Sequence, residues 1–286
     1  MSYERILCEE VEPNIVKITM NRPEKRNAID DLMVEELTDA FVQADFNDDV
    51  RVIILAGAGS DFSAGYDISG KGSPARGPLL SAVMQTKLTG MEKTLKTTDY
   101  IAYNQAIAIR DVSKPTIAMV QGNCIAAGLL YASICDLIVA SEDAQFIDPL
   151  SRWAHAGFEI LIEPYLFGFR KAKEVMWTGD PVSAKEAKEF GMVSRVVPRD
   201  KLEEETIQLA RKIAKTLPVA ASLVKRSVND AWDLMGLRHA WRYHLLAHEL
   251  SHVSDEAKRW DEMRAQAMQA GGVKEVLKTR DDQYKK

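Results

Sequence analysis

The sequence of 286 residues is poor in cysteine, in positive charge and in long apolar runs. Its three cysteines, Cys8, Cys124 and Cys135, form an odd and sparse set, which favours reduced thiols over a disulfide framework. No stretch approaches the roughly 18 uninterrupted apolar residues of a membrane-spanning helix. The net charge of −5 argues against a nucleic-acid-binding surface. Residues 1–5 lack the basic and apolar regions of a signal peptide, so we expect a cytoplasmic protein without membrane or nucleic-acid partners.

The sequence contains enough apolar residues, 46% of the total, to bury a substantial core. Strand-like runs alternate with segments whose apolar residues recur at helical spacing, and this order is typical of an α/β fold. We expect a strand within residues 5–20, around residues 15–20, further strands at 52–56, 116–120 and 137–140, and helices at 29–44 and 102–110.

The chain becomes helical throughout after about residue 201, with helices expected at 201–216, 219–235, 237–252 and 254–269. We therefore predict an α/β core of residues 1–200 and a helical region of residues 201–286 that supports oligomerisation and closes a pocket. Ser183 and Glu186 form a capping box. Residues 70–98 are expected to form a mobile loop that enters a helix, and residues 274–286 a solvated terminus.

Two strand-like runs end in segments rich in glycine and alanine. Residues 52–56 lead into residues 61–68, with Gly65, and residues 116–120 lead into residues 121–128, with Gly122 and Gly128. A strand that breaks at small, flexible residues can direct backbone N–H groups into a cavity. One donor from each exit would stabilise an oxyanion that develops on a carbonyl, so the pattern indicates acyl chemistry. Tight packing at a turn is the alternative explanation for each isolated glycine.

The order and spacing of several short motifs resemble those of the crotonase (enoyl-CoA hydratase/isomerase) superfamily. The resemblance extends over nearly the whole chain, from Ile15 into the C-terminal helices. Each motif is weak by itself, and their succession is specific. They are Asn21-Arg22-Pro23, Asn27-Ala28, Phe62-Ser63-Ala64-Gly65-Tyr66-Asp67, Lys114-Pro115-Thr116, Gly122-Asn123-Cys124-Ile125-Ala126-Ala127-Gly128, Cys135-Asp136, Ala144-Gln145-Phe146 and Thr178-Gly179-Asp180.

The resemblance implies a fold, a substrate class and a set of site residues. The fold would be a crotonase-type spiral of ββα turns with a C-terminal all-helical subdomain, in a homotrimer or a dimer of trimers. The substrate would be an acyl-CoA thioester, with coenzyme A as part of the substrate and neither a prosthetic group nor a metal. The oxyanion-hole amides correspond to Tyr66 and Ala127, and coenzyme A would bind at Ala64, Tyr66, Asp67 and Ile68.

The chain departs from the family where hydration chemistry is expected. Family hydratases use two glutamates that share one water molecule, and the corresponding positions here are Leu130 and Leu150. Leucine can neither accept nor donate a proton, so the usual hydratase pair is absent. The flanking residues Leu129, Tyr131, Pro149 and Ser151 do not restore it.

Other ionisable residues follow the second of these positions. Some relatives with different chemistry carry an acid a few positions downstream, near Glu159, whose neighbours Phe158 and Ile160 would raise its pKa by desolvation. Glu159 is therefore our candidate proton carrier, and His155 is a second candidate. The alternatives are an ion pair at a subunit surface for Glu159 and an ordinary hydrogen bond for His155. Asp148 precedes a proline, which favours a turn or cap role.

Residues 248–252, His-Glu-Leu-Ser-His, match the H-E-x-x-H pattern of zinc proteases, and His244 lies one helical turn earlier. The polar face of an amphipathic helix explains the same residues, and the sequence shows no evident third ligand. Three hypotheses follow. The first is an enzyme that forms an enolate from an acyl-CoA, by isomerisation, hydrolysis, retro-Claisen cleavage or hydration with relocated acids. The second is a catalytically silent CoA-binding or assembly protein, and the third is a zinc hydrolase.

Overall fold

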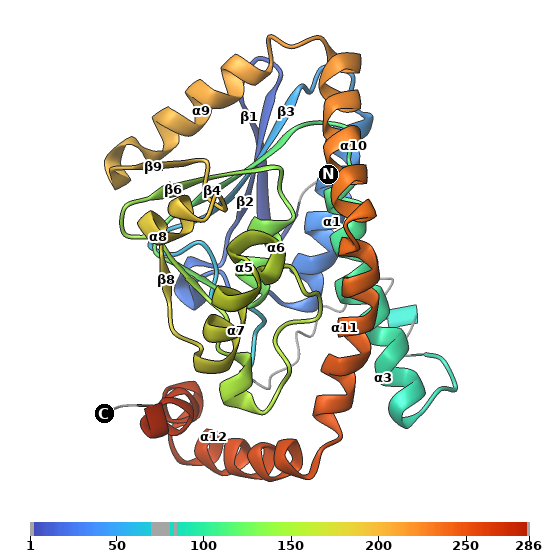
Figure 1. The fold of residues 1–286 in the computed structure, drawn as a ribbon, viewed down its shortest axis with the longest axis vertical. Helices are drawn as coiled ribbons and strands as arrows, with labels where there is room; N and C mark the ends of the chain where they lie inside the picture. The colour runs from blue at the N-terminus through green and yellow to red at the C-terminus, as the bar shows by residue number, and fades with distance from the viewer. Residues whose placement is uncertain (1–2, 70–80, 83–84, 285–286) are drawn as a thin grey trace.

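The computed structural model describes residues 3–69, 81–82 and 85–284. Within these residues the larger sheet has six strands in the order β1-β2-β3-β4-β6-β9 (Figure 1). β1 and β2 are antiparallel, and every later pair is parallel. The strands are β1 (Ile6–Glu12), β2 (Ile15–Met20), β3 (Val52–Gly57), β4 (Thr116–Val120), β6 (Leu137–Ser141) and β9 (Arg195–Val197).

A smaller sheet lies beside the larger one and contains, among the described residues, β5 (Asn123–Ile125), β7 (Gln145–Ile147) and β8 (Val182–Ser183). The chain passes from β4 to β5 and then into α5 (Ala127–Ser133), a strand–strand–helix succession. It passes in the same way from β6 to β7. The predicted α/β class is confirmed, and the predicted strands at 52–56, 116–120 and 137–140 agree with the observed ones to within one residue. The strand predicted within residues 5–20 is instead two antiparallel strands, β1 and β2.

The helices of the first half cover the larger sheet. α1 (Asp31–Phe46) begins where the Asp30 carboxylate accepts the Met33 N–H at 3.0 Å, a standard N-cap. The predicted helix at 102–110 is the end of a longer helical stretch, comprising α3 (Gly90–Thr98), the π-helix η2 (Asp99–Asn104) and α4 (Gln105–Arg110). The predicted mobile loop before this helix includes residues 70–80 and 83–84, which lie outside the described residues.

The predicted C-terminal helices are confirmed as α9 (Leu202–Ile213), α10 (Pro218–Leu234), α11 (Leu237–His252) and α12 (Asp255–Asp281). The solvated terminus predicted from residue 274 is wrong for the described part. α12 has a break at Gly271 and Gly272 and then continues, and Val276 is fully buried in a cluster with Trp153 and Trp260. The few apolar residues among the charged ones gave too weak a pattern to reveal this contact. No described helix combines the length and apolarity needed to cross a bilayer.

Shorter elements connect the smaller sheet to these helices. They are η1 (Pro23–Lys25), η3 (Leu150–Trp153), α6 (Glu163–Phe167), α7 (Phe169–Thr178), α8 (Ala184–Glu189), η4 (Arg199–Lys201) and η5 (Asp282–Tyr284). The predicted cap of α8 is present, since the Ser183 hydroxyl accepts the Glu186 N–H at 3.2 Å.

Helix α11 runs along one side of the molecule in Figure 1, and α12 turns beneath it. One face of α11 is buried, with Trp241 fully enclosed and His244, His248 and Glu249 less than one-tenth exposed. Arg110 of α4 holds the upper end of this helix, because its guanidinium lies 5.7 Å from the Trp241 ring centroid and pairs with Asp233 of α10. A buried helix face with this many polar groups is unusual.

Asn27 connects the turn before α1 to the loop after β3. It is fully buried with φ of 53°, and its amide nitrogen donates to the carbonyl oxygens of Ala58, Asp61 and Phe62 at 2.8, 2.9 and 3.2 Å. Its amide oxygen accepts the Arg22 N–H at 3.0 Å. One side chain thus satisfies several backbone groups that have no strand partner.

Replacing Asn27 with alanine should lower the free energy of unfolding by about 2–4 kcal/mol, because buried carbonyls lose their donor and alanine disfavours positive φ. Urea denaturation followed by circular dichroism measures the change. The control is Asn47→Ala, at an exposed C-cap, which should cost less than about 1 kcal/mol. Equal effects of the two substitutions would contradict the proposed role of Asn27.

Candidate functional site

The two glycine- and alanine-rich strand exits lie against each other. β3 and β4 are parallel neighbours, so both exits leave the same edge of the larger sheet. Ser63 and Cys124 then form an isolated parallel bridge, in which the Ser63 N–H donates to the Asn123 carbonyl at 3.1 Å and the Ile125 N–H to the Ser63 carbonyl at 2.9 Å. Segments far apart in sequence are thereby fixed side by side.

Glycine is required at two points of this contact. A methyl group on Gly65, which has φ of 85°, would lie 2.9 Å from the Ile125 carbonyl oxygen and 3.5 Å from the Ala127 nitrogen. A methyl group on Gly128 would lie 2.8 Å from the Ser63 Cβ. Both positions therefore exclude a side chain, and the explanation by tight packing holds for them. The same packing brings the residue 65–66 backbone next to the first turn of α5.

The backbone N–H groups of Tyr66 and Ala127 have no hydrogen-bond acceptor among the described residues. Ala127 is the first residue of α5, where N–H groups have no intrahelical partner and the helix carries partial positive charge. Ala126 before it has φ of 47° and ψ of −112°, a strained conformation for alanine. The two exits therefore present one unused donor each beside their contact.

The predicted coenzyme A residues lie on the same loop as Tyr66. The Ala64 N–H donates to the Arg26 carbonyl at 2.9 Å. The Asp67 carboxylate is paired with Arg22 at 2.9 Å and with Lys25 at 3.0 Å. Burial raises the pKa of Asp67, and its hydrogen bonds and these cations outweigh burial and hold the pKa well below the usual range.

Ile68, the last of the predicted coenzyme A residues, packs beside Trp153 and Trp260, so this loop reaches the C-terminal helix α12. The part of α12 that carries Trp260 and Ala267 therefore belongs to the same apolar cluster as the end of the predicted coenzyme A segment.

Leu130 and Leu150, the predicted equivalents of the family glutamates, are apolar positions of the fold. Leu130 lies in the first turn of α5, 1% exposed, and Leu150 begins η3, where it packs against the main core. Neither position supplies a proton-transfer group.

Glu159 is enclosed and has no basic partner among the described residues. Its Oε2 is buried without a hydrogen bond, between the fully buried Phe158 and Ile160. Burial raises the pKa of Glu159 to about 7, and the charge of Glu249 adds to this rise. The charge of Glu159 in turn acts on the hydroxyl of Tyr66, whose pKa burial already raises. The interpretation of Glu159 as a surface ion pair is therefore not supported.

His155 belongs to a cluster of stacked imidazoles that sequence reasoning did not bring together. Its ring centroid lies 3.9 Å from that of His252 and 5.9 Å from that of His248. The His248 Nδ1 lies 2.7 Å from the Gly157 carbonyl oxygen, so this nitrogen must donate, and the His248 Nε2 then accepts from the His252 Nε2 at 3.0 Å. This pattern joins α11 to residues 155–157. Only the contact itself reveals it, since the two segments are almost a hundred residues apart.

Asp148 and Glu163 form a second buried carboxyl pair beneath this segment. Both are fully buried, and the Asp148 Oδ2 and the Glu163 Oε1 have no hydrogen-bond partner among the described residues. Burial raises the pKa of Asp148 to about 6 and raises that of Glu163 well above its ordinary value, an effect to which the charge of Asp148 contributes. The predicted cap role of Asp148 is also present, since its Oδ1 accepts the Leu150 N–H at 3.1 Å.

The H-E-x-x-H residues lie on α11 as the pattern requires, but the part of the chain that the structure describes has no group of three or more His, Cys, Asp or Glu side chains placed to hold a metal ion. A zinc site in a hydrolase needs three protein ligands. The described residues thus give the zinc-hydrolase hypothesis no support.

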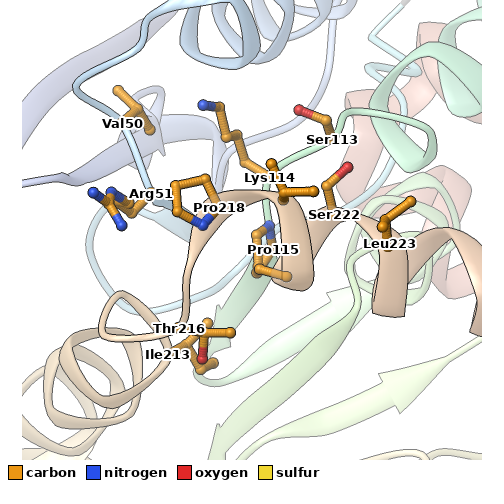
Figure 2. A pocket seen from close by; sticks show the side chains of 12 residues that line it. Val50, Arg51, Ser113, Lys114, Pro115, Ile213, Thr216, Pro218, Ser222 and Leu223 are labelled. Carbon is orange, nitrogen blue, oxygen red and sulfur yellow. The ribbon is translucent and has the colours of Figure 1, made fainter.

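A cavity of about 270 Å³ opens at the other end of the same strands. Val50 and Arg51 precede β3, and Lys114 and Pro115 precede β4, while the opposite wall comes from the α9–α10 junction (Figure 2). This cavity is therefore separate from the strand exits with the two unused donors.

The histidine cluster predicts a loss of stability in acid. Burial, followed by the charges of His252 and His248, lowers the pKa of His155 to about 3, against 6.5 for a free histidine. A histidine whose pKa is depressed by folding stabilises the protein above the unfolded pKa, and this contribution is lost as the pH falls from 6.5 toward 3. His155→Phe keeps the ring but cannot titrate, so its melting temperature should fall less than that of wild type between about pH 7.5 and about pH 5.

Differential scanning fluorimetry across this pH range measures the melting temperatures of wild type and variant. The buried carboxyls change stability in the opposite direction with pH, but they are present in both proteins. The matched control is His239→Phe at an exposed position of α11, which should follow wild type. Parallel curves for His155→Phe and wild type would contradict the assignment.

Comparisons with known proteins agree with the observed arrangement. The enoyl-CoA hydratase/isomerase family model matches residues 10–260. The chain is 38% identical over 280 residues to the putative enoyl-CoA hydratase EchA13 of Mycobacterium tuberculosis, covering 95% of this chain and 86% of that protein.

Two solved structures extend the comparison. A probable enoyl-CoA hydratase from Mycobacterium smegmatis superimposes with a TM-score of 0.78 at 37% identity, covering 88% of this chain and 95% of that one. An enoyl-CoA hydratase/isomerase from Xanthobacter autotrophicus Py2 gives a TM-score of 0.84 at 29% identity, with both chains fully covered. Sequence motifs, family model and superposition thus agree, and the chain belongs to the enoyl-CoA hydratase/isomerase family of the crotonase superfamily.

Proposed function

We propose that this protein converts an acyl-CoA thioester into its enolate, with the backbone amides of Tyr66 and Ala127 binding the thioester oxygen and Glu159 transferring the proton at Cα. The observation that carries the proposal is the position of Glu159. A carboxyl with a pKa of about 7 interacts electrostatically with Tyr66, the residue whose own N–H is one of the two unused donors.

The two amides have the properties that an oxyanion site needs. They are fixed by the contact of Gly65 with residues 125–127 and by the bridge between Ser63 and Cys124. Donors held in place before the reaction stabilise developing charge without reorganisation, and the removal of one such donor typically costs about 10²–10³-fold in rate. These donors belong to the main chain, so they do not depend on which side chains the loop carries.

Glu159 suits a proton carrier because its pKa lies near neutral pH. At pH 7 both of its protonation states are populated, so it can take a proton from Cα in one step and return one in the next. Leu130 and Leu150 leave this task to other groups. An enolate and one carrier permit exchange of the Cα proton and migration of a double bond.

The first test follows exchange of the Cα protons of a saturated acyl-CoA with D₂O by mass spectrometry, over a panel of acyl chain lengths. Wild type should incorporate deuterium, and Glu159→Gln should lower the rate by about 10²–10⁴-fold, because glutamine cannot carry the proton. The control is Glu262→Gln at an exposed position of α12, which should exchange like wild type. Exchange at the wild-type rate by Glu159→Gln would refute the assignment of Glu159. No exchange by wild type with any acyl-CoA would favour the silent binder.

We also propose that residues 201–286 mediate assembly into a homotrimer or a dimer of trimers. Helix α10 exposes large apolar side chains, a property that marks interaction surfaces. Its exposed apolar residues are Val219, Leu223, Val224, Val228 and Leu234, each more than half exposed. α10 also carries charged residues, among them the exposed Arg226 and Asp230, so it is not apolar throughout.

Val224→Asp combined with Val228→Asp places two charges one helical turn apart on this surface, and the substitution should convert the oligomer to a smaller species. Sedimentation velocity measures the mass of wild type and variant. The control is the pair Arg226→Asp and Asp230→Arg, which reverses an exposed ion pair of the same helix. A wild-type protein that sediments as a monomer would refute the proposal.

A further inference from the structure

The cavity at the amino ends of β3 and β4 has no part in the proposed function. Its volume of about 270 Å³ is a little below the roughly 300–1,000 Å³ of pockets that hold drug-sized ligands. The described residues that line it include two cations, Arg51 and Lys114, and no acid (Figure 2). The cavity therefore has the size of a small ligand and a positive charge.

The strand register brings Arg51 and Lys114 together. Ile53 pairs with Thr116 in the parallel ladder of β3 and β4, and each cation stands two residues before one of these partners. Neighbouring strands lie about 4.8 Å apart, so the two side chains start from equivalent positions on adjacent strands. Both residues are only partly exposed, and neither side chain has an ion pair or a hydrogen bond within the described residues. Both charges are thus available to a ligand.

The beginning of α10 lines the same cavity. Pro218 is the first residue of this helix and has no N–H, while the N–H groups of Val219 and Ala220 have no acceptor among the described residues. No side chain caps this end of the helix. Free N–H groups and the partial positive charge of a helix N-terminus favour the binding of phosphate. These donors add to the two cations that line the opposite wall.

Contacts outside the cavity hold its walls in place. The Lys225 ammonium of α10 donates to the Lys114 carbonyl at 3.0 Å and pairs with Asp136 at 2.9 Å. The Asp45 carboxylate accepts the Ser113 N–H at 2.7 Å and the Ser113 hydroxyl at 2.5 Å. A site that is formed before binding loses less conformational freedom when its ligand enters.

We propose that this cavity is a second ligand site, which binds a small phosphate monoester. Such a group carries a charge of about −1.5 to −2 at pH 7, and Arg51 and Lys114 balance it. Arginine can bind phosphate through two parallel hydrogen bonds, and lysine binds it as a point charge. The organic group of the ligand lies against the apolar side chains of the lining, which include Val50, Pro115 and Leu223.

Isothermal titration calorimetry with n-butyl phosphate, in a buffer free of phosphate and sulfate, tests the site. The wild type is used in its assembled form, because Val219 and Leu223 also belong to the exposed apolar surface of α10. It should bind one n-butyl phosphate per chain. Arg51→Gln and Lys114→Gln should each weaken binding by about 10–100-fold, because a hydrogen bond between charged groups is lost.

The matched controls are Arg170→Gln and Lys185→Gln, which remove exposed cations outside the cavity and should bind n-butyl phosphate like wild type. A further variant, Ser222→Asp, places an acid in the lining near the positive end of α10, where the helix tolerates it. Ser222→Asp should abolish binding and keep the melting temperature of wild type, so that its loss of binding does not reflect unfolding.

The proposal is refuted if wild type does not bind n-butyl phosphate, or if neither Arg51→Gln nor Lys114→Gln weakens the binding. Inorganic phosphate or sulfate that binds as tightly as n-butyl phosphate shows an anion site without an organic ligand, and it overturns the assigned ligand class. Pentanoate that binds as tightly also overturns it, because pentanoate carries a single charge. The proposed function is tested separately, since a lack of Cα exchange with every acyl-CoA would leave the binding of n-butyl phosphate unaffected.

Discussion

The structure depends on the close approach of two backbone segments that leave neighbouring strands. Four glycines permit it, since a methyl group would lie 2.3 Å from the Phe62 carbonyl oxygen at Gly57 and 2.3 Å from that of Ser60 at Gly122, with similar conflicts at Gly65 and Gly128. Backbone packed this closely cannot drift, and its unused N–H groups keep their direction.

Asp61 stabilises the approach from one side. Its carboxylate accepts the Asn123 N–H at 3.0 Å and a side-chain hydrogen bond from Ser60 at 2.6 Å. Burial raises its pKa, but the hydrogen bonds from Ser60 and Asn123 outweigh burial, and the net shift is downward. The ionised form is thus the one that the fold uses. The Asn27 side chain donates to the Asp61 carbonyl, so two buried side chains hold the loop that follows β3.

The region between α11 and residues 148–163 follows a different rule from the rest of the interior. Here several histidines and carboxyls lie close together in the interior, and several of their polar atoms have no hydrogen-bond partner. Burial keeps the histidines neutral and raises the pKa of the carboxyls. The same enclosure therefore favours the uncharged form of both residue types, and a proton transferred within the region need not enter bulk solvent.

The sequence alone predicted the α/β fold class and the two glycine- and alanine-rich strand exits. Strand-like runs and helical periodicity located most elements, because each depends on local spacing. Leu130 and Leu150 cannot transfer a proton, and from the sequence Glu159 is therefore the candidate proton carrier. Long-range contacts were not predictable. The packing of His155 on His252 depends on how α11 crosses the core, which no local pattern encodes.

Val276 shows the same limit at the chain's end, where one buried apolar residue among charged neighbours carries no periodic signal. The pattern around residue 248 is compatible with a metal motif and with an amphipathic helix, because a helix presents residues four apart on one face in both cases. Its meaning came from what that face contacts, and the contact partner lies in the α/β core.

Ala126, held at positive φ just before the unused N–H of Ala127, has a consequence for how such a protein can change. A donor that belongs to the main chain is not lost when a side chain is exchanged, so mutation can move the acidic residues around it while the intermediate stays stabilised. Diversity of reactions then requires only new positions for carboxyls on the surrounding helices. A fold of this kind can acquire a new chemistry without passing through a form that binds its substrate poorly.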